Sequence, residues 1–304
     1  MKNYNNQLKQ IRYFLEYILI IPLFWAMRPL SIKAKSCFGI FAGKYIMYPF
    51  LLLKGKKRYA IIVKNLEIVL NKKLSITEAK RLVKEYSSNI VRIFTEGLGQ
   101  RQMTKQWLIQ NVEVRNIERL LEAHRNGRKI IIPSAHIGNW EIAHKYLYEV
   151  YGIKTTIIYR KQNNIKIDAS YVKKRSHIEL IEKRDPSALR KMVKSLANAH
   201  VLVVLLDQRN QTNGIPIEFF GITALFPTAI SRLALKSNSD IYCGYCHRLP
   251  HNTHKFCLSF EDQTIYGKNS TPETITHNIF KQFEKWITAH PTQWFCLIQD
   301  IWRK

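Results

Sequence analysis

Short apolar runs alternate with amphipathic stretches from residue 129 onward. The apolar runs cover residues 129–135, 155–159, 201–206, 241–245 and 256–260, and helical patterns between them cover residues 140–151, 186–198, 228–238 and 272–289. Runs of this length, separated by helices, indicate strands that are buried on both faces of a sheet. The pattern therefore predicts an α/β fold in which helices flank a largely parallel or mixed sheet. Earlier in the chain, Ser75 and Glu78 form a capping-box signature, which predicts the start of a helix that continues to about Gly97.

The first part of the chain has a different pattern. Residues 17–27 form an uninterrupted apolar run, and residues 38–53 form a second run that is broken by Lys44 and Pro49. The first run has about half of the ~20 residues that a spanning helix needs. Through residue 75 there are 14 Lys or Arg against two acidic residues. Apolar segments with Trp and Tyr, flanked by basic residues, suit an anionic membrane interface, although core helices of a soluble domain are equally apolar.

We therefore expect a membrane-associating helical segment over residues 1–58 and an α/β domain over residues 59–304. The apolar runs are compatible with a shallow interfacial anchor and with a single marginal span.

The large net positive charge of the chain favours anionic partners. Lys and Arg exceed Asp and Glu by 48 − 22 = 26, and the excess is spread along the chain. Such a field attracts anions, namely nucleic acid, an anionic membrane surface or an acidic protein, although a Lys-rich proteome gives the same excess without a specific partner. A nucleic-acid-binding protein is the rival class. The apolar N-terminal region and the lack of a recognisable binding motif count against it, so we expect no nucleic acid partner.

The five cysteines are odd in number and irregularly spaced, which favours a reducing compartment over a disulfide framework. Cys243, Cys246 and His247 match the pattern of covalent haem attachment. Their segment, however, is expected to be a strand, on which residues three apart face opposite ways. We therefore predict no haem, and no metal or nucleotide motif indicates another cofactor.

A histidine followed by an acid five residues later marks the candidate chemistry. This spacing occurs three times, at His136 and Glu141, His144 and Glu149, and His177 and Glu182. His136 is distinguished because it follows the predicted strand 129–135 directly, at the carboxyl edge where open α/β sheets build their sites. Gly138 and Asn139 then supply a turn and a helix cap, which places Glu141 where its carboxylate can orient the imidazole. A neutral histidine held in this way can act as a general base toward an alcohol, and a purely structural histidine is the alternative.

The motifs around this pair resemble those of the bacterial lipid A biosynthesis acyltransferases, the late lauroyl and myristoyl transferases. The matching segments follow in order and cover nearly the whole chain: residues 134–141, 159–160, 163–164, 207–208, 219–221 and 290–294. Two departures lie elsewhere. Residues 297–302 stand where the family often closes with His and Arg, and residues 199–200 replace a common Gly. Neither departure touches His136 or Glu141.

The resemblance implies a glycerolipid acyltransferase-like sandwich and an O-acyltransferase in which His136 is the general base and Glu141 its partner. The candidate substrate-binding residues are Gly138, Asn139, Arg160, Arg175, Asp207, Gln208, Phe219 and Phe220. Arg160 suits a phosphate or a developing oxyanion because its guanidinium is always charged and fork-shaped. Asp207 and Gln208 are expected to contact a substrate hydroxyl, and the two Phe to shape the acyl pocket or the core. Arg175 lies in a basic run that could bind phosphates, although such runs are usually solvated.

The implied donor is an acyl chain held as a thioester on acyl carrier protein. The implied acceptor is a hydroxyl of a phosphorylated lipid A precursor, at the cytoplasmic face of the inner membrane. No Ser or Cys stands beside His136 in a nucleophile elbow, so direct transfer without an acyl-enzyme is expected. The alternatives are another lipid acceptor, such as a lysophospholipid or a mannosylated lipid, and a catalytically inactive membrane scaffold.

Overall fold

A five-stranded parallel sheet forms the centre of the molecule. The computed structural model describes residues 22, 25–173, 175, 178–208, 214–250, 254–261, 265–267 and 269–302. The strand order is β4-β3-β5-β2-β8, and every neighbouring pair is parallel. These strands are β2 (Ile130–Ser134), β3 (Thr155–Tyr159), β4 (Ile178–Glu182), β5 (Val201–Leu205) and β8 (Asp240–Ile241). The predicted α/β fold with a parallel sheet is confirmed.

Two smaller β elements lie beside this sheet. Strands β1 (Val112–Arg115), β10 (Phe256–Phe260) and β9 (Gly244–Arg248) form a mixed three-stranded sheet in that order. Strands β6 (Ile215–Phe219) and β7 (Ile222–Phe226) form an antiparallel hairpin.

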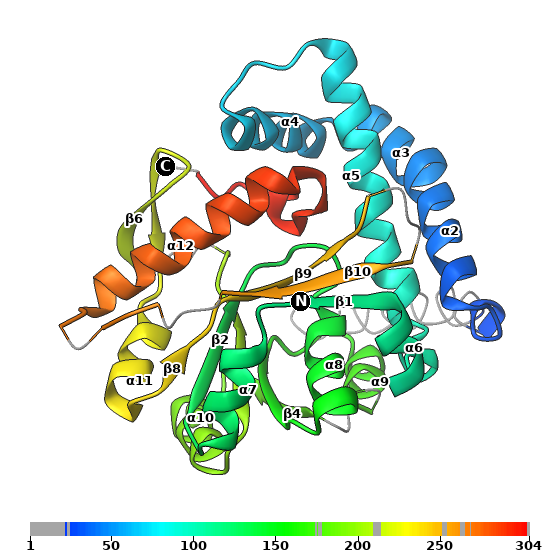
Figure 1. The fold of residues 1–304 in the computed structure, drawn as a ribbon. Coiled ribbons are helices and arrows are strands. Elements are labelled where there is room, and N and C mark those ends of the chain that lie inside the picture. The colour runs from blue at the N-terminus through cyan, green and yellow to red at the C-terminus, as the bar shows by residue number, and fades with distance from the viewer. Residues whose placement is uncertain are drawn as a thin grey trace, which may run out of the picture.

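Helices surround the sheets, as Figure 1 shows. After β1 they are α7 (Glu118–Arg125), α8 (Glu141–Tyr151), α9 (Ile165–Lys173), α10 (Ala188–Ala197), α11 (Ala229–Ser237) and α12 (Pro272–Ala289), followed by the 3-10 turns η3 (Pro291–Gln293) and η4 (Phe295–Ile298). Before β1 they are α2 (Ile32–Ala42), the π-helical turn η1 (Gly43–Met47), α3 (Tyr48–Leu53), α4 (Lys56–Leu70), α5 (Ile76–Gly97), η2 (Gln100–Gln102) and α6 (Lys105–Asn111). The predicted capping box starts α5, because the Ser75 hydroxyl accepts from the Glu78 N–H and the Glu78 carboxylate accepts from the Ser75 N–H.

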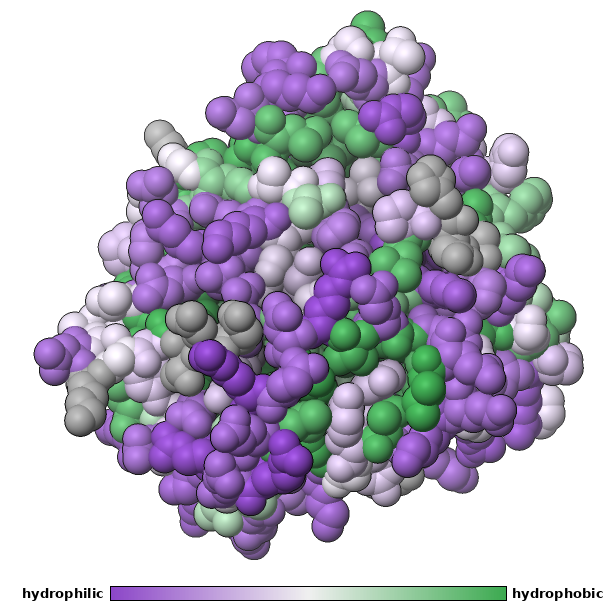
Figure 2. All heavy atoms as spheres, viewed as in Figure 1, coloured by the Kyte–Doolittle hydropathy of each residue, from purple (hydrophilic) through white to green (hydrophobic). Residues whose placement is uncertain are grey.

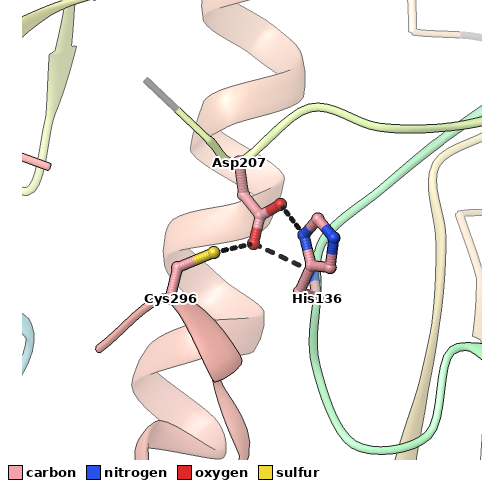
Figure 3. A group of neighbouring side chains, drawn as sticks. All are labelled: His136, Asp207 and Cys296. Carbon is pink, nitrogen blue, oxygen red and sulfur yellow. Dashed lines mark hydrogen bonds and ion pairs between the residues drawn. The ribbon is translucent and has the colours of Figure 1, made fainter. Parts of the chain in front are cut away.

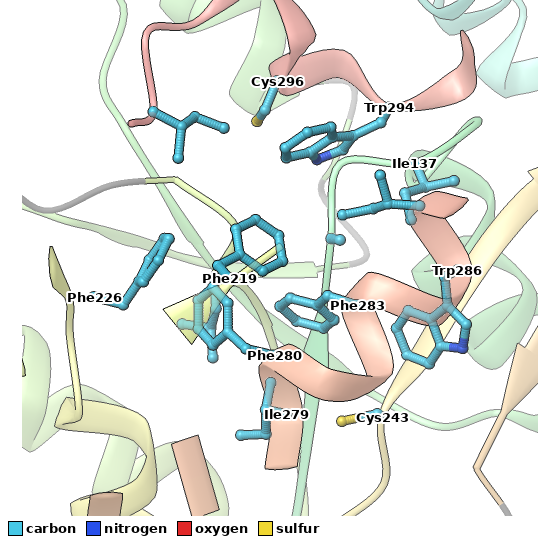
Figure 4. Close-up of a cluster of buried hydrophobic side chains, with 14 of the residues drawn as sticks. Ile137, Phe219, Phe226, Cys243, Ile279, Phe280, Phe283, Trp286, Trp294 and Cys296 are labelled. Atoms are coloured by element: carbon cyan, nitrogen blue, oxygen red, sulfur yellow. The ribbon is translucent and has the colours of Figure 1, made fainter. Parts of the chain in front are cut away.

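The two faces of the parallel sheet bury two separate cores. Along β2 and β5, Ile131, Leu202 and Val204 belong to one core, whereas their neighbours Ile130 and Val203 belong to the other. This alternation follows from the period of two along a strand. The first core also holds an aromatic cluster from β6, β7, α12 and the junction of η3 and η4, which includes Phe219, Phe226, Phe280, Phe283 and Trp294 (Figure 4). Burial on both faces explains why the strands read as continuous apolar runs.

Helix α2 packs very closely on α5, and Figure 1 shows the two helices side by side. A Cβ added at Gly39 would lie 2.8 Å from the Arg92 Cα, and one added at Gly43 would lie 2.3 Å from the Ser88 Cα. Two small residues four apart on one helix face therefore let the backbones approach. The helical stretch Ile32–Leu53 is long and apolar enough to cross a membrane by length and composition, yet 28% of its most apolar window is buried against the protein. Residues 17–21, 23 and 24 of the first predicted apolar run lie outside the described residues.

The predicted strand at residues 241–245 is wrong in one respect. Strand β8 ends at Ile241 in the parallel sheet, and β9 begins at Gly244 in the mixed sheet. The residues between β8 and β9 are buried as well, so the sequence shows one apolar run although the two strands belong to different sheets. Cys243 and Cys246 are both fully buried as free thiols in the two cores.

Two stacked histidines couple stability to pH. The rings of His247 on β9 and His290 after α12 stack with centroids 4.0 Å apart. Burial lowers the pKa of His247 to about 3 and also lowers the pKa of His290. Below the usual histidine pKa, these side chains therefore take up protons in the unfolded state but stay neutral in the folded state.

We expect the free energy of unfolding to fall as the pH drops from about 6.5 to 5, by at most about 1.4 kcal/mol per pH unit for His247. Urea unfolding at a series of pH values measures this slope. In His247→Phe the slope becomes shallower, because the ring is kept and the proton site is lost. The same change at His124, a half-exposed residue of α7, leaves the slope as it was. An equal slope in wild type and His247→Phe contradicts the prediction.

Candidate active site

The end of β2 delivers His136 to the carboxyl edge of the parallel sheet. The chain turns at once, since the Ile137 N–H donates to the Ala135 carbonyl, and Gly138 adopts a positive φ of 58°. A Cβ at Gly138 would lie 2.3 Å from the Cys246 carbonyl oxygen, so only glycine fits. The turn is held from both sides by backbone bonds, from Gly138 N–H to the Gln293 carbonyl and from Asn139 N–H to the Cys246 carbonyl.

Asp207 holds the imidazole of His136 (Figure 3). The Asp207 Oδ1 lies 2.6 Å from His136 Nδ1, and Oδ2 accepts from the His136 backbone N–H at 2.9 Å. Asp207 follows β5, which pairs directly with β2, so the two residues leave neighbouring strands at the same edge. A buried carboxylate accepts a hydrogen bond from Nδ1–H, which leaves the lone pair of a neutral ring on Nε2. The ring retains 14% of its exposed surface, whereas the Asp207 side chain has none.

The Asp207 carboxylate stays ionised because it is surrounded by donors. Burial by itself would raise its pKa, but the His136 ring, the His136 N–H and the Trp294 indole N–H outweigh burial and lower the pKa below its usual value. On Oδ2 the Trp294 Nε1 donates at 2.8 Å and the Cys296 thiol at 3.4 Å. The nearest atoms of His136, Asp207 and Cys296 lie within 4.8 Å, a spacing that a metal could bridge. The carboxylate is already committed to hydrogen bonds, however, so the geometry fits a proton relay better than a ligand set.

Glu141 has a different set of partners from the one expected. Its Oε2 accepts from Arg175 Nε at 2.8 Å, from Gln100 Nε2 at 2.9 Å, and lies 3.3 Å from His144 Nε2. The expected direct pairing of Glu141 with the His136 ring is therefore corrected, because Asp207 occupies Nδ1 and a buried guanidinium is the stronger partner for Glu141. Burial would raise the Glu141 pKa, but His144 and Arg175 together lower it to about 2.

Asn139 is buried and does not cap α8. The helix begins after Trp140 without a side-chain cap, and the Asn139 Nδ2 instead donates to the Glu96 carboxylate at 2.8 Å. Glu96 also accepts from Arg248 Nη1 at 2.6 Å. Asn139 thus ties the His136 turn to α5 and β9, and Gly138 contributes close packing.

The other predicted site residues fall into two groups. Arg160 is exposed directly after β3, and Gln208 is half-buried directly after Asp207, so both lie at the edge that carries His136. Phe219 is fully buried in the aromatic core (Figure 4). Phe220 has a positive φ of 55° at the tip of the β6–β7 hairpin, where Glu284 accepts its N–H. Its ring centroid lies 6.3 Å from that of Trp294, so it borders the residues around Asp207.

The sequence of this chain is similar to those of known acyltransferases. The sequence model of the bacterial lipid A biosynthesis acyltransferases matches residues 1–304, which confirms the resemblance found in the motifs. The chain is also similar to a phosphatidylinositol mannoside acyltransferase of Mycolicibacterium smegmatis. The two are 21% identical over 237 residues, which cover 73% of this chain and 72% of that protein.

The Glu141–Arg175 pair generates a stability prediction. Both side chains are buried, with 12% and 9% of their surface exposed. Replacing Arg175 with Met strands a buried carboxylate, and we expect the free energy of unfolding to fall by about 3–5 kcal/mol. Urea unfolding at pH 7 measures the loss. Adding Glu141→Gln to Arg175→Met should recover part of it, because the stranded charge is removed.

The matched control is Arg190→Met, which removes an exposed guanidinium from α10. It should change stability by no more than about 0.5 kcal/mol. If Arg175→Met is equally mild, the ion pair does not hold Glu141 as described.

Proposed function

Because this chain belongs to the bacterial lipid A biosynthesis acyltransferase family, we propose that it transfers a fatty acyl chain from an acyl carrier protein thioester to a hydroxyl of a lipid A precursor. The observation that carries the proposal is the His136–Asp207 pair, with Nδ1 bonded to a buried carboxylate at 2.6 Å. An alcohol is a weak nucleophile, and a neutral imidazole oriented in this way is a suitable base for it.

The reaction is a direct transfer. His136 Nε2 removes the proton of the acceptor hydroxyl as its oxygen attacks the thioester carbonyl. The tetrahedral intermediate then collapses, the carbon–sulfur bond breaks, and the leaving thiolate takes the proton from the imidazolium. Asp207 remains ionised throughout and stabilises the positive ring. Glu141 acts at one remove from the ring, because it lies at the start of α8 and holds Arg175 and Gln100.

A basic rim beside the pair supports anionic substrates. Because β3 pairs in parallel with β5, and β4 pairs in parallel with β3, the residues after these strands share one edge. These residues are exposed and cationic: Arg160, Lys161, Lys183, Arg184 and, in the first turn of α10, Arg190. Phosphate groups of a glycolipid and the surface of an acidic carrier protein both suit such a rim.

A second acceptor class has its own support. The similar mycobacterial protein is named for a mannosylated phosphatidylinositol acceptor. The same imidazole chemistry serves any lipid hydroxyl, so a mannosylated lipid or a lysophospholipid is the alternative acceptor.

Purified enzyme tests the chemistry and the acceptor together. We expect acyl transfer from acyl carrier protein, rather than from acyl coenzyme A, to the lipid A precursor, followed by mass spectrometry of the product. His136→Ala should lose at least about 10²–10⁴-fold in turnover, and Asp207→Asn should lose a similar factor because the ring loses its orientation. Glu141→Gln should lose less, since Glu141 does not touch the ring.

His277→Ala, on α12, and Asp300→Asn, an exposed residue after η4, are the controls, and they should retain wild-type turnover. Transfer only to a mannosylated lipid or a lysophospholipid would move the assignment to the alternative acceptor. Full activity of His136→Ala would refute the mechanism, whereas no transfer by the wild-type protein to any of these acceptors would favour the catalytically inactive scaffold.

The surface of α2, η1 and α3 supports attachment to the cytoplasmic face of an anionic inner membrane. One side of Ile32–Leu53 packs on α5, and the other side exposes Phe41, Tyr45, Ile46, Phe50 and Leu53, each by more than half. The face in Figure 2 is mostly hydrophilic, with hydrophobic areas that include the edge where α2 and α3 lie. Since α5 carries buried Arg92 and Glu96 beneath α2, we favour a helix that lies in the interface over one that spans the bilayer.

Vesicle flotation tests this attachment. Wild-type protein should float with vesicles that contain phosphatidylglycerol and much less with neutral phosphatidylcholine vesicles. The double change Phe41→Ser and Phe50→Ser should reduce flotation by about tenfold, because roughly 1–2 kcal/mol of interfacial burial is lost. Leu189→Ser, which removes an equally exposed apolar side chain from α10, should float normally. Equal flotation of the double variant contradicts the proposed surface.

A further inference from the structure

The segment Pro291–Ile298 lies against both members of the catalytic pair. The Phe295 N–H donates to the His136 carbonyl at 2.8 Å, and the Gly138 N–H donates to the Gln293 carbonyl at 3.0 Å. Ile137 and Trp294 also form an antiparallel bridge. We call residues 291–298 the closing segment. Its backbone fixes the turn that carries His136, and its side chains reach Asp207.

The N-terminal helices hold the closing segment in place from the other side. Tyr86 on α5 donates its hydroxyl proton to the Phe295 carbonyl at 2.9 Å. The Asn65 amide on α4 donates to the Leu297 carbonyl at 2.7 Å and to the Gln299 carbonyl at 2.8 Å. Within the segment, the Gln293 side chain pairs with the backbone N–H and carbonyl of Arg248. Two side chains of the closing segment therefore meet Asp207 in a fixed geometry.

We propose that Trp294 and Cys296 are positioning residues that set the basicity of His136 by donating hydrogen bonds to Oδ2, the Asp207 oxygen that does not bond the ring. The inference rests on the proposed function, because it takes His136 as the base. Trp294 and Cys296 are both fully buried, and both bonds end on Oδ2, whereas the ring is bonded to Oδ1. Oδ1 therefore orients the ring, while Oδ2 receives the two donors of the closing segment.

The sulfur donates rather than accepts. Burial and the nearby Asp207 carboxylate raise the pKa of Cys296 well above its usual value, so the thiol keeps its proton. The indole N–H of Trp294 can only donate. Each donor draws negative charge toward Oδ2 and places a positive dipole near the ring, so each lowers the affinity of the imidazole for a proton. A less basic imidazole stays neutral to lower pH and remains ready to accept the proton of an alcohol.

Few other charges surround the imidazole among the described residues. Asp207 faces His136 from the end of β5, and Cys296 faces Asp207 from η4. Glu141 on α8 and Glu96 on α5 are each already in an ion pair with an arginine. The rings of Trp140 and Phe295 also lie beside the imidazole, with centroids 4.9 and 6.0 Å away. A shift in the titration of His136 therefore reports mainly on Asp207 and its donors.

The test compares two tryptophans that make the same kind of bond. Trp294→Phe removes the donor to Asp207 and keeps most of the ring. Trp302→Phe removes an indole donor in the same aromatic cluster, but this donor bonds the Phe219 carbonyl. In Trp294→Phe we expect the acidic limb of the kcat/KM profile to move upward by about 0.5–1 pH unit. In Trp302→Phe the limb should stay at its wild-type position.

Cysteine variants supply a second and milder pair. Cys296→Ala should move the acidic limb in the same direction, by less than Trp294→Phe because the thiol bond is longer. Cys296→Ser should return it close to wild type, since a hydroxyl is again a donor. KM should change by less than about twofold in all four variants. Lower turnover with an unmoved limb in both Trp294→Phe and Cys296→Ala would show a merely structural role and overturn the proposal.

NMR titration of ¹⁵N-histidine-labelled protein separates this inference from the proposed function. The His136 ring should titrate at higher pH in Trp294→Phe than in wild type or Trp302→Phe, with no substrate present. A shifted ring in an enzyme that transfers no acyl chain would support the inference and sink the proposed function. An unshifted His136 ring in Trp294→Phe, together with acyl transfer by the wild-type enzyme, would overturn the inference and leave the proposed function standing.

Discussion

The ionised carboxylate of Asp207, buried without exposed surface, is the constraint on which this structure depends. It joins three segments that are distant in sequence: the turn after β2, the end of β5 and the closing segment. A buried charge is tolerated only where donors replace water. Four donors do so here, from His136, Trp294 and Cys296. The arrangement that keeps the acid ionised is also the one that aims the imidazole outward.

Much of the fold could be read from the sequence because its signals are local. Continuous apolar runs predicted β2, β3, β5 and β10, and the Ser75 and Glu78 cap predicted the start of α5. Strand β4 and the β6–β7 hairpin were missed, since mixed burial leaves them without an apolar run. The position of His136 at a strand end was also predictable, because parallel strands present their carboxyl ends at one edge.

The partner of His136 could not be read from spacing along the chain. Glu141 is five residues away, but the turn at Gly138 and the guanidinium of Arg175 direct its carboxylate elsewhere. Asp207 is 71 residues away and lies next to the ring because β5 pairs with β2. The order of strands in the sheet decides this contact, and that order cannot be read from the local pattern of residues. Trp294 lies in the matched segment 290–294, but the match gives it no role, and Cys296 looks like an ordinary buried thiol of the core.

The turn that carries His136 is bonded through its backbone on both flanks, to the Gln293 carbonyl and to the Cys246 carbonyl. Main-chain bonds of this kind do not depend on the identity of the side chains around them. Substitutions on the exposed rim can therefore accumulate without displacing the base. Recognition and chemistry are separable in such a scaffold, and a new lipid can be accommodated by evolution at the periphery while the proton-transfer centre is inherited intact.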